Sequence, residues 1–350
     1  MISRLTLVFS FLIFLTNGYF TAVSSFEVPG AQRPSTRFGR STTQQLFSIP
    51  ETKYIRDSTT TMDCSDATIA RFAGKNVLLT GASSGLGRSF ALKLARCGVK
   101  TLILSARKEK ELQQVAEECK SSSAALEVKI ILGDLADKAS VKKLSMEALA
   151  FCPTIDVLIN NGGISSRSNF VDTSIDVDER LMQVNFLSGA ALAKAVVPGM
   201  VQKGQGAIIW IGSVQGLLGI PQRTSYAASK FAVQGYCEAL RGELASSGVT
   251  VHVASPGYIR TNLSRSAVTG DGNTYGKMDA TTEAGADPDD VAVTILDSVT
   301  NGKMDFTVAS GFSATVAIYL ACSVRLCFDL CLSSALTRLK RKRRKSEECH

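Results

Sequence analysis

The chain has 350 residues, of which 45% are hydrophobic and 20% are charged. This composition is typical of an α/β protein and excludes a disordered or fibrous chain, while the length suits one domain of roughly 250 residues plus additional segments. The sequence contains two histidines, His252 and His350, and its nine cysteines include no C-x-x-C pair. We therefore expect neither a metal site nor a disulfide scaffold.

The net charge of +8 is concentrated at the two ends of the chain. Residues 1–56 carry a net charge of +4 and residues 338–350 carry +5, so the residues between them are almost neutral, at −1. A nucleic-acid-binding domain usually has a basic face on its folded part. The charge distribution therefore predicts no nucleic-acid partner.

The amino-terminal residues have the pattern of a targeting signal. Arg4 precedes an apolar run, and small residues follow at Ala22 and Ser24, so we expect residues 1–25 to be a signal peptide or a membrane anchor. Residues 26–65 begin with a basic stretch rich in Ser and Thr, which is typical of a transit peptide. We expect entry into the secretory pathway and attachment to the endoplasmic reticulum membrane. Import into a plastid through a two-part presequence is the alternative.

Between about residues 66 and 309, short apolar runs alternate with longer amphipathic stretches. This alternation predicts an α/β fold, a doubly wound parallel sheet of Rossmann type that forms a single catalytic domain. Ligands of such sheets bind beyond the carboxyl ends of the strands. The predicted strands are Lys75–Thr80, Lys100–Ser105, Glu127–Leu132, Ile155–Asn160, Gly206–Gly212, Val249–Ser255 and a final strand at Phe306–Val308.

A glycine-rich turn follows the first predicted strand and opens a helix. Its glycines let the backbone turn tightly and approach a pyrophosphate, whose charge the amide groups of the helix start would bind. A plain tight turn is the alternative. The predicted cofactor-binding residues here are Thr80, Gly81, Ser83, Ser84, Gly85, Leu86 and Gly87.

The residue that follows the second strand favours NADP(H) over NAD(H). An NAD enzyme usually has an acidic side chain at this point, which binds the ribose hydroxyls. Arg107 occupies the position here, and its guanidinium can pair with a 2′-phosphate. Alternatively, Arg107 is a solvated side chain beside Glu109 and Glu111.

The ends of the third and fourth strands extend the predicted cofactor site. Asp134, which precedes Leu135, could accept a hydrogen bond from the adenine amino group, or it could cap the helix that follows. The small residues around Asn161 would let the cofactor lie against the backbone. We expect Asp134, Leu135 and Asn161 to contribute to cofactor binding.

Three polar side chains provide the chemistry of carbonyl reduction. Ser213 ends the fifth strand, Tyr226 opens a helical run, and Lys230 lies four residues later on the same helix face. Reducing a ketone requires a proton at the oxygen, and a nearby ammonium lowers the pKa of a tyrosine, ordinarily about 10, toward neutrality. We expect Tyr226 to be the acid/base and Ser213 to bind the substrate carbonyl.

A second apolar stretch precedes the basic tail, residues 338–350. Its uninterrupted part, Gly311–Val324, is shorter than the ~20 residues that a spanning helix needs. We expect residues 310–337 to be a helix that lies in the membrane interface, with the basic tail on lipid phosphates. A tilted span is the alternative.

These motifs together resemble the short-chain dehydrogenase/reductase family over about residues 70–309. The resemblance rests on T-G-A-S-S-G-L-G at 80–87, N-N-G-G at 160–163, Ser213 and Y-A-A-S-K at 226–230. Within the family, S-A-R at 105–107, S-P-G-Y-I-R-T-N at 255–262 and the apolar, basic carboxyl end are similar to the membrane-associated branch of members 7 and 7B.

The resemblance implies roles for individual residues. Asn185 would support a water chain to Lys230, and Lys230 with Tyr226 would also contact the cofactor. Ser84 and Leu86 would touch it through their backbone, and the remaining implied contacts are Pro256, Gly257 and Thr261. The usual alanine of the N-N-A-G motif is Gly162 here, which we expect to loosen that turn.

The resemblance also implies an oxidoreductase that acts on CH–OH donors with NADP(H). The expected substrate is a lipophilic ketone, aldehyde or secondary alcohol, and residues 262–287 would shape its pocket. Family members generally self-associate, here as a homodimer or homotetramer through helices near 176–202 and 226–246.

Two other functions fit parts of the sequence. A membrane-bound NADP(H) sensor or scaffold without turnover would keep the glycine-rich turn, although such a protein need not keep both Tyr226 and Lys230. A hydrolase would use Ser83 in a G-x-S-x-G turn, but it would also need a histidine on a loop. His252 alternates within an apolar strand, so we expect it to be a packed strand residue.

Overall fold

The computed structural model describes residues 51–55, 62–123 and 125–310. The predicted signal peptide at 1–25, the basic tail and residues 311–337 of the helix predicted at 310–337 lie outside the described residues. Ser310, which we expected in that helix, ends the last strand instead.

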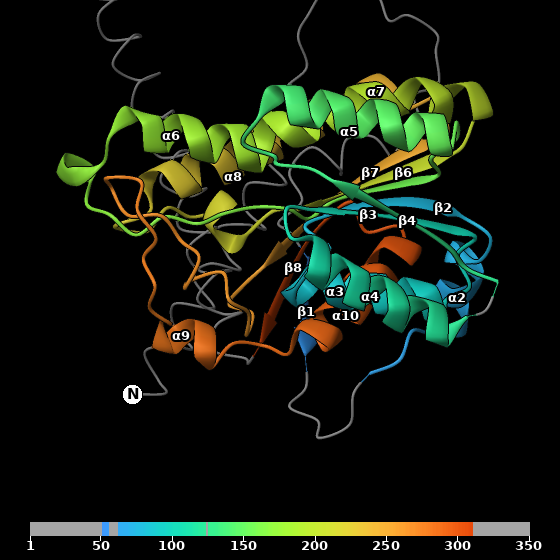
Figure 1. The fold of residues 1–350 in the computed structure, drawn as a ribbon, viewed down its shortest axis with the longest axis horizontal. Helices are drawn as coiled ribbons and strands as arrows, with labels where there is room; N and C mark the ends of the chain where they lie inside the picture. The colour runs from blue at the N-terminus through green and yellow to red at the C-terminus, as the bar shows by residue number, and fades with distance from the viewer. Residues whose placement is uncertain (1–50, 56–61, 124, 311–350) are drawn as a thin grey trace, which may run out of the picture. The chain divides into compact units, whose positions relative to one another are not determined.

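An eight-stranded sheet organises the described residues (Figure 1). Every neighbouring pair of strands is parallel, so all the carboxyl ends lie at one edge. The strand order is β1-β8-β7-β6-β5-β2-β3-β4. The strands are β1 Glu51–Ile55, β2 Asn76–Thr80, β3 Thr101–Ala106, β4 Glu127–Leu132, β5 Val157–Asn160, β6 Gly206–Ile211, β7 Val249–Pro256 and β8 Asp305–Ser310.

Helices cover both faces of the sheet, which confirms the doubly wound prediction (Figure 1). The amphipathic helices bury their apolar stripes in two separate clusters, one on each face. One face carries α2 Asp66–Phe72, α3 Gly85–Arg96, α4 Glu109–Ser122 and α10 Pro288–Thr300. The other carries α5 Lys138–Phe151, α6 Ile175–Met182, α7 Ser188–Lys203 and α8 Thr224–Leu244.

The order in which the strands are added to the sheet reverses at β2. From β2 the chain proceeds outward to β3 and β4, and then returns to the other side of β2 to form β5, β6 and β7. A reversal of this kind separates the loops that follow two neighbouring strands and opens a crevice above the sheet. The glycine-rich turn after β2 and the N-N-G-G segment after β5 flank this point.

All seven predicted strands are present, and β1 is an eighth that the sequence analysis did not include. β1 lies within the stretch that we interpreted as a linker and pairs in parallel with β8. One continuous helical stretch, Ile175–Lys203, is long and apolar enough to span a membrane by length and composition. Its buried residues Leu181, Leu192 and Val196 pack within the fold, so it is a core helix.

Candidate active site

The turn after β2 has a backbone that only glycine accommodates. Gly81 has a φ of 65°, and a Cβ at this position would lie 2.7 Å from the Cα of Gly162. A Cβ at Gly87 would lie 2.0 Å from the carbonyl oxygen of Gly81. The turn is therefore packed against both the start of α3 and the end of β5, with its amide groups at the head of a twelve-residue helix.

Thr80 and Asn161 fix this turn to β5. The Thr80 hydroxyl oxygen accepts hydrogen bonds from the amides of Asn161 and Gly162, at 3.1 Å and 3.0 Å. The Asn161 side-chain amide donates to the carbonyl oxygens of Thr80 and Gly81, at 3.0 Å and 3.2 Å. These bonds hold the turn against the end of β5, and a role for either residue in binding the cofactor stays a prediction.

The glycine that replaces the family's usual alanine has a specific neighbour. A Cβ at Gly162 would lie 2.5 Å from the Cδ1 atom of Leu135. We expected this glycine to loosen the turn, but the Leu135 side chain occupies the space that the methyl group would need. A methyl group at this position would require the end of the flexible Leu135 side chain to move.

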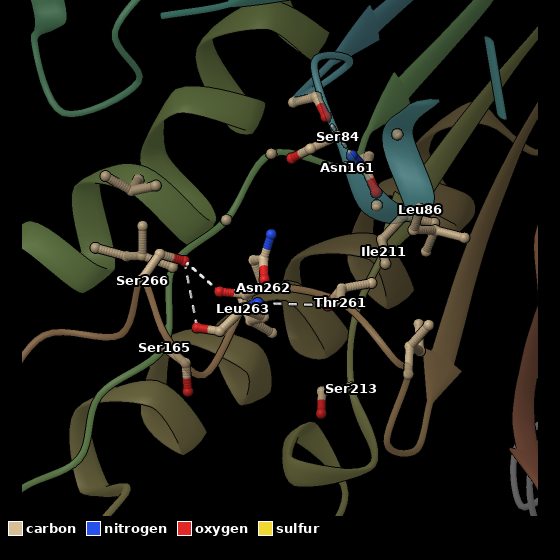
Figure 2. A pocket seen from close by; sticks show the side chains of 18 of the residues that line it. Ser84, Leu86, Asn161, Ser165, Ile211, Ser213, Thr261, Asn262, Leu263 and Ser266 are labelled. Carbon is tan, nitrogen blue, oxygen red and sulfur yellow. Dashed lines mark hydrogen bonds between the residues drawn. The ribbon is translucent and has the colours of Figure 1, made fainter. Parts of the chain in front are cut away.

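A cavity of about 540 Å³ lies at the carboxyl edge of the sheet (Figure 2). We refer to it as the central cavity. Figure 2 shows Ser84 and Asn161 close to each other at one side, Ser213 farther along, and Thr261–Leu263 between them. The predicted residues that line it are Gly81, Ser83, Ser84, Gly85, Leu86, Gly87, Arg107, Asp134, Leu135, Asn161, Ser213, Tyr226, Lys230, Pro256, Gly257 and Thr261.

Arg107 lies at the cavity wall with an exposed side chain. Its possible acidic neighbour Glu111 pairs instead with Lys108, at 3.0 Å. Among the residues that the structure describes, no carboxylate forms a salt bridge with Arg107. The guanidinium is therefore available to an anionic ligand at the end of β3.

Asp134 does not cap the following helix, so that alternative is wrong. Asp137 is the N-cap of α5 and accepts hydrogen bonds from the amides of Ala139 and Ser140, at 2.9 Å and 3.2 Å. Asp134 instead accepts a hydrogen bond from the Ala136 amide at 3.0 Å, within the turn that precedes the helix. Its carboxylate remains at the cavity wall.

The three predicted catalytic side chains converge at the inner part of the cavity. The Ser213 hydroxyl, at the end of β6, is hydrogen-bonded to the hydroxyl of Tyr226 on α8. The Lys230 amine lies 5.8 Å from the centroid of the Tyr226 ring and donates to the carbonyl oxygen of Ile211, at 2.8 Å. Tyr226 and Lys230 are 6% and 5% exposed, so both hydroxyl and amine are shielded from bulk water.

Burial dominates the acidity of these groups. It raises the pKa of Tyr226 above its ordinary value, against the lowering effects of the Ser213 hydrogen bond and of the Arg223 and Arg167 charges. Burial also lowers the pKa of Lys230 to about 8. We expected the lysine to lower the pKa of the tyrosine. The charges that lower it here are those of Arg223 and Arg167, and an effect of Lys230 stays a prediction.

Asn185 lies behind the cavity wall and is 2% exposed. Its side-chain oxygen accepts a hydrogen bond from the Ile164 amide, at 2.8 Å, and its side-chain nitrogen donates to the Ile164 carbonyl and the Ser229 hydroxyl, both at 2.9 Å. It sits in a π-helical segment, Gln183–Leu187, between α6 and α7. The wider turn of the π-helix places the Asn185 side chain between the loop after β5 and helix α8, which carries Tyr226.

The sequence analysis missed a cluster of charged side chains beside Tyr226. Arg167 donates to the Asp279 carboxylate at 2.6 Å, and Arg223 lies 3.5 Å from the same carboxylate. The side chains of Arg167 and Arg223 are 8% and 12% exposed, and both line the central cavity. The position of Arg223, three residues before Tyr226, was the only signal in the sequence.

His252 is a packed strand residue, as expected. It is 2% exposed on β7, where its ring nitrogens bond the Lys303 carbonyl oxygen and the Thr250 hydroxyl, at 2.7 Å and 2.9 Å. Burial lowers the pKa of His252 to about 4. It does not line the central cavity, so no described histidine can activate Ser83 and the hydrolase interpretation has no base.

A family model of short-chain dehydrogenases matches residues 75–272. Among curated proteins, the chain is 44% identical to a dehydrogenase/reductase SDR family protein 7-like of Drosophila melanogaster, over 71% of this chain and 76% of that protein. It is also 44% identical to dehydrogenase/reductase SDR family member 7B of Danio rerio, over 70% of this chain and 80% of that protein.

Solved structures with the same fold contain nicotinamide cofactors. A short-chain dehydrogenase from Sphingobium yanoikuyae in complex with NADPH is 28% identical, with a TM-score of 0.59 over 73% of this chain and 96% of that one. A short-chain dehydrogenase/reductase from Burkholderia phymatum in complex with NAD is 25% identical, with a TM-score of 0.60 over 70% of this chain and 92% of that one. The chain belongs to the short-chain dehydrogenase/reductase family, in the branch of members 7 and 7B, and is an oxidoreductase whose cofactor is a nicotinamide dinucleotide.

Proposed function

We propose that this oxidoreductase uses NADP(H) to reduce a ketone or aldehyde, or to oxidise the corresponding alcohol, with Tyr226 as the general acid/base. The observation that carries the proposal is the hydrogen bond between Ser213 and Tyr226 at the inner end of the central cavity, with the Lys230 amine nearby. This arrangement provides a proton donor, a second hydroxyl for the substrate oxygen and a cation in one shielded place.

The residues of the cavity fit a dinucleotide. Side chains at Gly81 and Gly87 would collide with the backbone, so the turn presents bare main chain and the amide groups of the α3 start to an anion. NADP(H) supplies or accepts the hydride when it is bound. Arg107 and Ser105 at the end of β3 would hold its 2′-phosphate, and Asp134 would face its adenine.

The chain's own residues hold and move the proton. In the direction of reduction, the Tyr226 hydroxyl donates its proton to the substrate oxygen, which the Ser213 hydroxyl also binds. The resulting tyrosinate is stabilised by Ser213 and by the positive charges of Arg223 and Arg167. Asn185 positions the loop after β5 against α8 through its bonds to Ile164 and Ser229.

Replacing Tyr226 by phenylalanine tests the role of the hydroxyl. We expect Tyr226→Phe to lower kcat by at least about a thousandfold, since it removes the acid/base, while NADPH still binds. Turnover with a panel of lipophilic ketones and aldehydes, together with NADPH fluorescence titration, measures both quantities. Tyr236→Phe is the matched control, because Tyr236 lies on the same helix but packs against Phe186 and Trp210.

The same measurements separate an enzyme from a sensor. NADPH binding by the unaltered chain without turnover of any carbonyl in the panel would favour an NADP(H)-binding sensor or scaffold. Near-normal turnover by Tyr226→Phe would contradict the acid/base role directly.

The preference for NADP(H) rests on Arg107. We expect Arg107→Asp to raise the Kd for NADPH by at least roughly tenfold and to leave the Kd for NADH unchanged or lower, because the new carboxylate repels the 2′-phosphate and can bind ribose hydroxyls. Lys110→Asp makes the same change in charge on α4 at a residue outside the cavity wall. An NADPH/NADH ratio that is equal in all three proteins would contradict the proposal.

The proposed substrate is lipophilic. The segment after β7 contributes Asn262, Leu263, Ser264 and Ser266 to the cavity wall, which supports its predicted role in shaping the substrate pocket (Figure 2). Leu263 and Tyr258 are 38% and 39% exposed, so part of this wall is apolar and accessible. These features favour a ketone or secondary alcohol that carries an apolar chain or ring.

We also propose that copies of the chain self-associate through the helices at 175–203 and 224–244. Leu187 and Val201 on the first of these stretches are both 42% exposed and offer apolar surface to a second copy. The amino-terminal sequence favours the endoplasmic reticulum membrane as its location, with a plastid as the alternative.

A further inference from the structure

The segment that precedes α2 is fastened to the carboxyl end of α3. The Lys93 amine on α3 donates to the Met62 carbonyl oxygen at 2.7 Å. The Ser65 hydroxyl donates to the Asp297 carboxylate on α10 at 3.0 Å. Cys64 lies between these two attachments, and Cys97 directly follows the last residue of α3.

Cys64 and Cys97 are in direct side-chain contact. The Cys97 thiol donates a hydrogen bond to the Cys64 sulfur, and Cys64 packs against the buried cluster that contains Cys97. Both are free thiols. A disulfide requires its two sulfurs at ~2.05 Å and its Cα atoms within about 7 Å, so it can form only between neighbours of this kind. Cys64 and Cys97 share the same buried cluster and the same neighbouring ammonium, that of Lys93.

The two thiols differ in the ways that an exchange reaction requires. Cys64 is partly exposed on the irregular segment before α2, whereas Cys97 is 1% exposed at the helix end. The contact with Cys97 and the nearby Lys93 ammonium lower the pKa of Cys64, against burial and the charges of Asp297 and Asp63. The same contact raises the pKa of Cys97. Cys64 is the thiol that a dissolved disulfide can reach, so it is the nucleophile, and the buried Cys97 is the resolving thiol.

We propose that Cys64 and Cys97 form a disulfide when the protein meets a low-molecular-weight disulfide of the glutathione type. The Cys64 thiolate attacks one sulfur of the oxidant, forms a mixed disulfide and releases one thiolate. Cys97 then gives up its proton and attacks the Cys64 sulfur, which displaces the second thiolate. Two protein thiols are oxidised, and one disulfide is reduced to two thiols.

The bond would fasten the fold without entering the active site. It encloses α2, β2, the glycine-rich turn and α3, and so restricts the unfolded chain around the cofactor-binding turn. Cys97 lies near the amino edge of the sheet, where the Gly98 carbonyl accepts a bond from the Gly74 amide before β2. The central cavity lies at the carboxyl edge. We therefore expect oxidation to raise thermal stability and to leave cofactor affinity unchanged.

The test compares the full chain after incubation with oxidised glutathione and with dithiothreitol. Non-reducing proteolysis and mass spectrometry should recover a peptide that links Cys64 to Cys97, lighter by about 2 Da than the two separate thiol peptides. The Tm of the oxidised chain should exceed that of the reduced chain by roughly 5 °C or more. Since both readouts are independent of turnover, they stand or fall separately from the proposed function.

Matched variants assign the effect to this pair. Cys64→Ser and Cys97→Ser should each abolish the linked peptide and the difference in Tm. Cys119→Ser, which removes a buried thiol on α4, should preserve both. Recovery of unlinked Cys64 and Cys97 after complete incubation, or of Cys64 only as a stable mixed disulfide, would overturn the proposal. Should Cys97→Ser fail to fold, Cys64→Ser at the partly exposed position still decides the question.

Discussion

The acidity of Tyr226 is set by groups from three parts of the chain. Burial in the wall of the central cavity raises the pKa of its hydroxyl, whereas Ser213 from the end of β6 lowers it by donating a hydrogen bond. Arg223 at the start of α8 and Arg167 from the loop after β5 lower it through their charges. The two arginines share one carboxylate, that of Asp279, so the cluster keeps a positive charge.

Removal of the Arg223 charge should shift the pH dependence of the reaction. Alcohol oxidation needs tyrosinate as the base, so its rate rises with pH through the pKa of Tyr226. Arg223→Gln removes a charge that favours tyrosinate, and we therefore expect the rising limb of the kcat/KM profile to move to higher pH by roughly 0.5 to 1. Asp279 keeps its bond to Arg167, so the change leaves no unpaired carboxylate.

Two variants serve as controls for this shift. Arg223→Lys retains a cation and should keep most of the original profile, and Arg260→Gln removes an exposed arginine that pairs with Asp287 away from Tyr226. An unchanged rising limb in Arg223→Gln, measured with the cofactor at saturation, would show that Arg223 does not tune Tyr226.

The helices and strands of the nucleotide-binding part could be predicted from sequence because their signals are local. β2, β5 and β6 are runs of apolar residues that are buried on both faces, and the glycines of the turn after β2 are required by the backbone itself. The catalytic roles expected of Ser213, Tyr226 and Lys230 could be inferred from local position. Ser213 lies at a strand end, and Tyr226 and Lys230 lie on one helix face. Each of these inferences uses only neighbours in the chain.

The features that were missed depend on contacts between distant segments. These features are the close approach of Leu135 to Gly162, the charge of Arg167 beside Tyr226 and the contact between Cys64 and Cys97. Each joins residues that are far apart in sequence. The π-helical segment around Asn185 lies within a longer helical pattern that hides the extra residue in its turn. β1 belongs to the sheet through its pairing with β8, which is the last strand in the sequence.

The attachment of the whole molecule to a membrane is testable through its carboxyl end. We expect the full chain to sediment with vesicles that contain anionic lipid and a variant ending at residue 310 to sediment at least about tenfold less, because residues 311–350 hold the apolar segment and the basic tail. Vesicles of neutral lipid measure the contribution of charge. Equal sedimentation of both proteins would locate the attachment elsewhere in the chain.

The parallel direction of β8 has a geometric consequence for a hydrophobic substrate. Because β8 runs alongside β7 in the same sense, the chain leaves the sheet at Ser310 on the same side as the mouth of the catalytic crevice. The segment that we expect to bind a membrane therefore begins on the crevice side of the sheet. With the membrane on that side, a lipophilic ketone dissolved in the bilayer would have a short path to Tyr226.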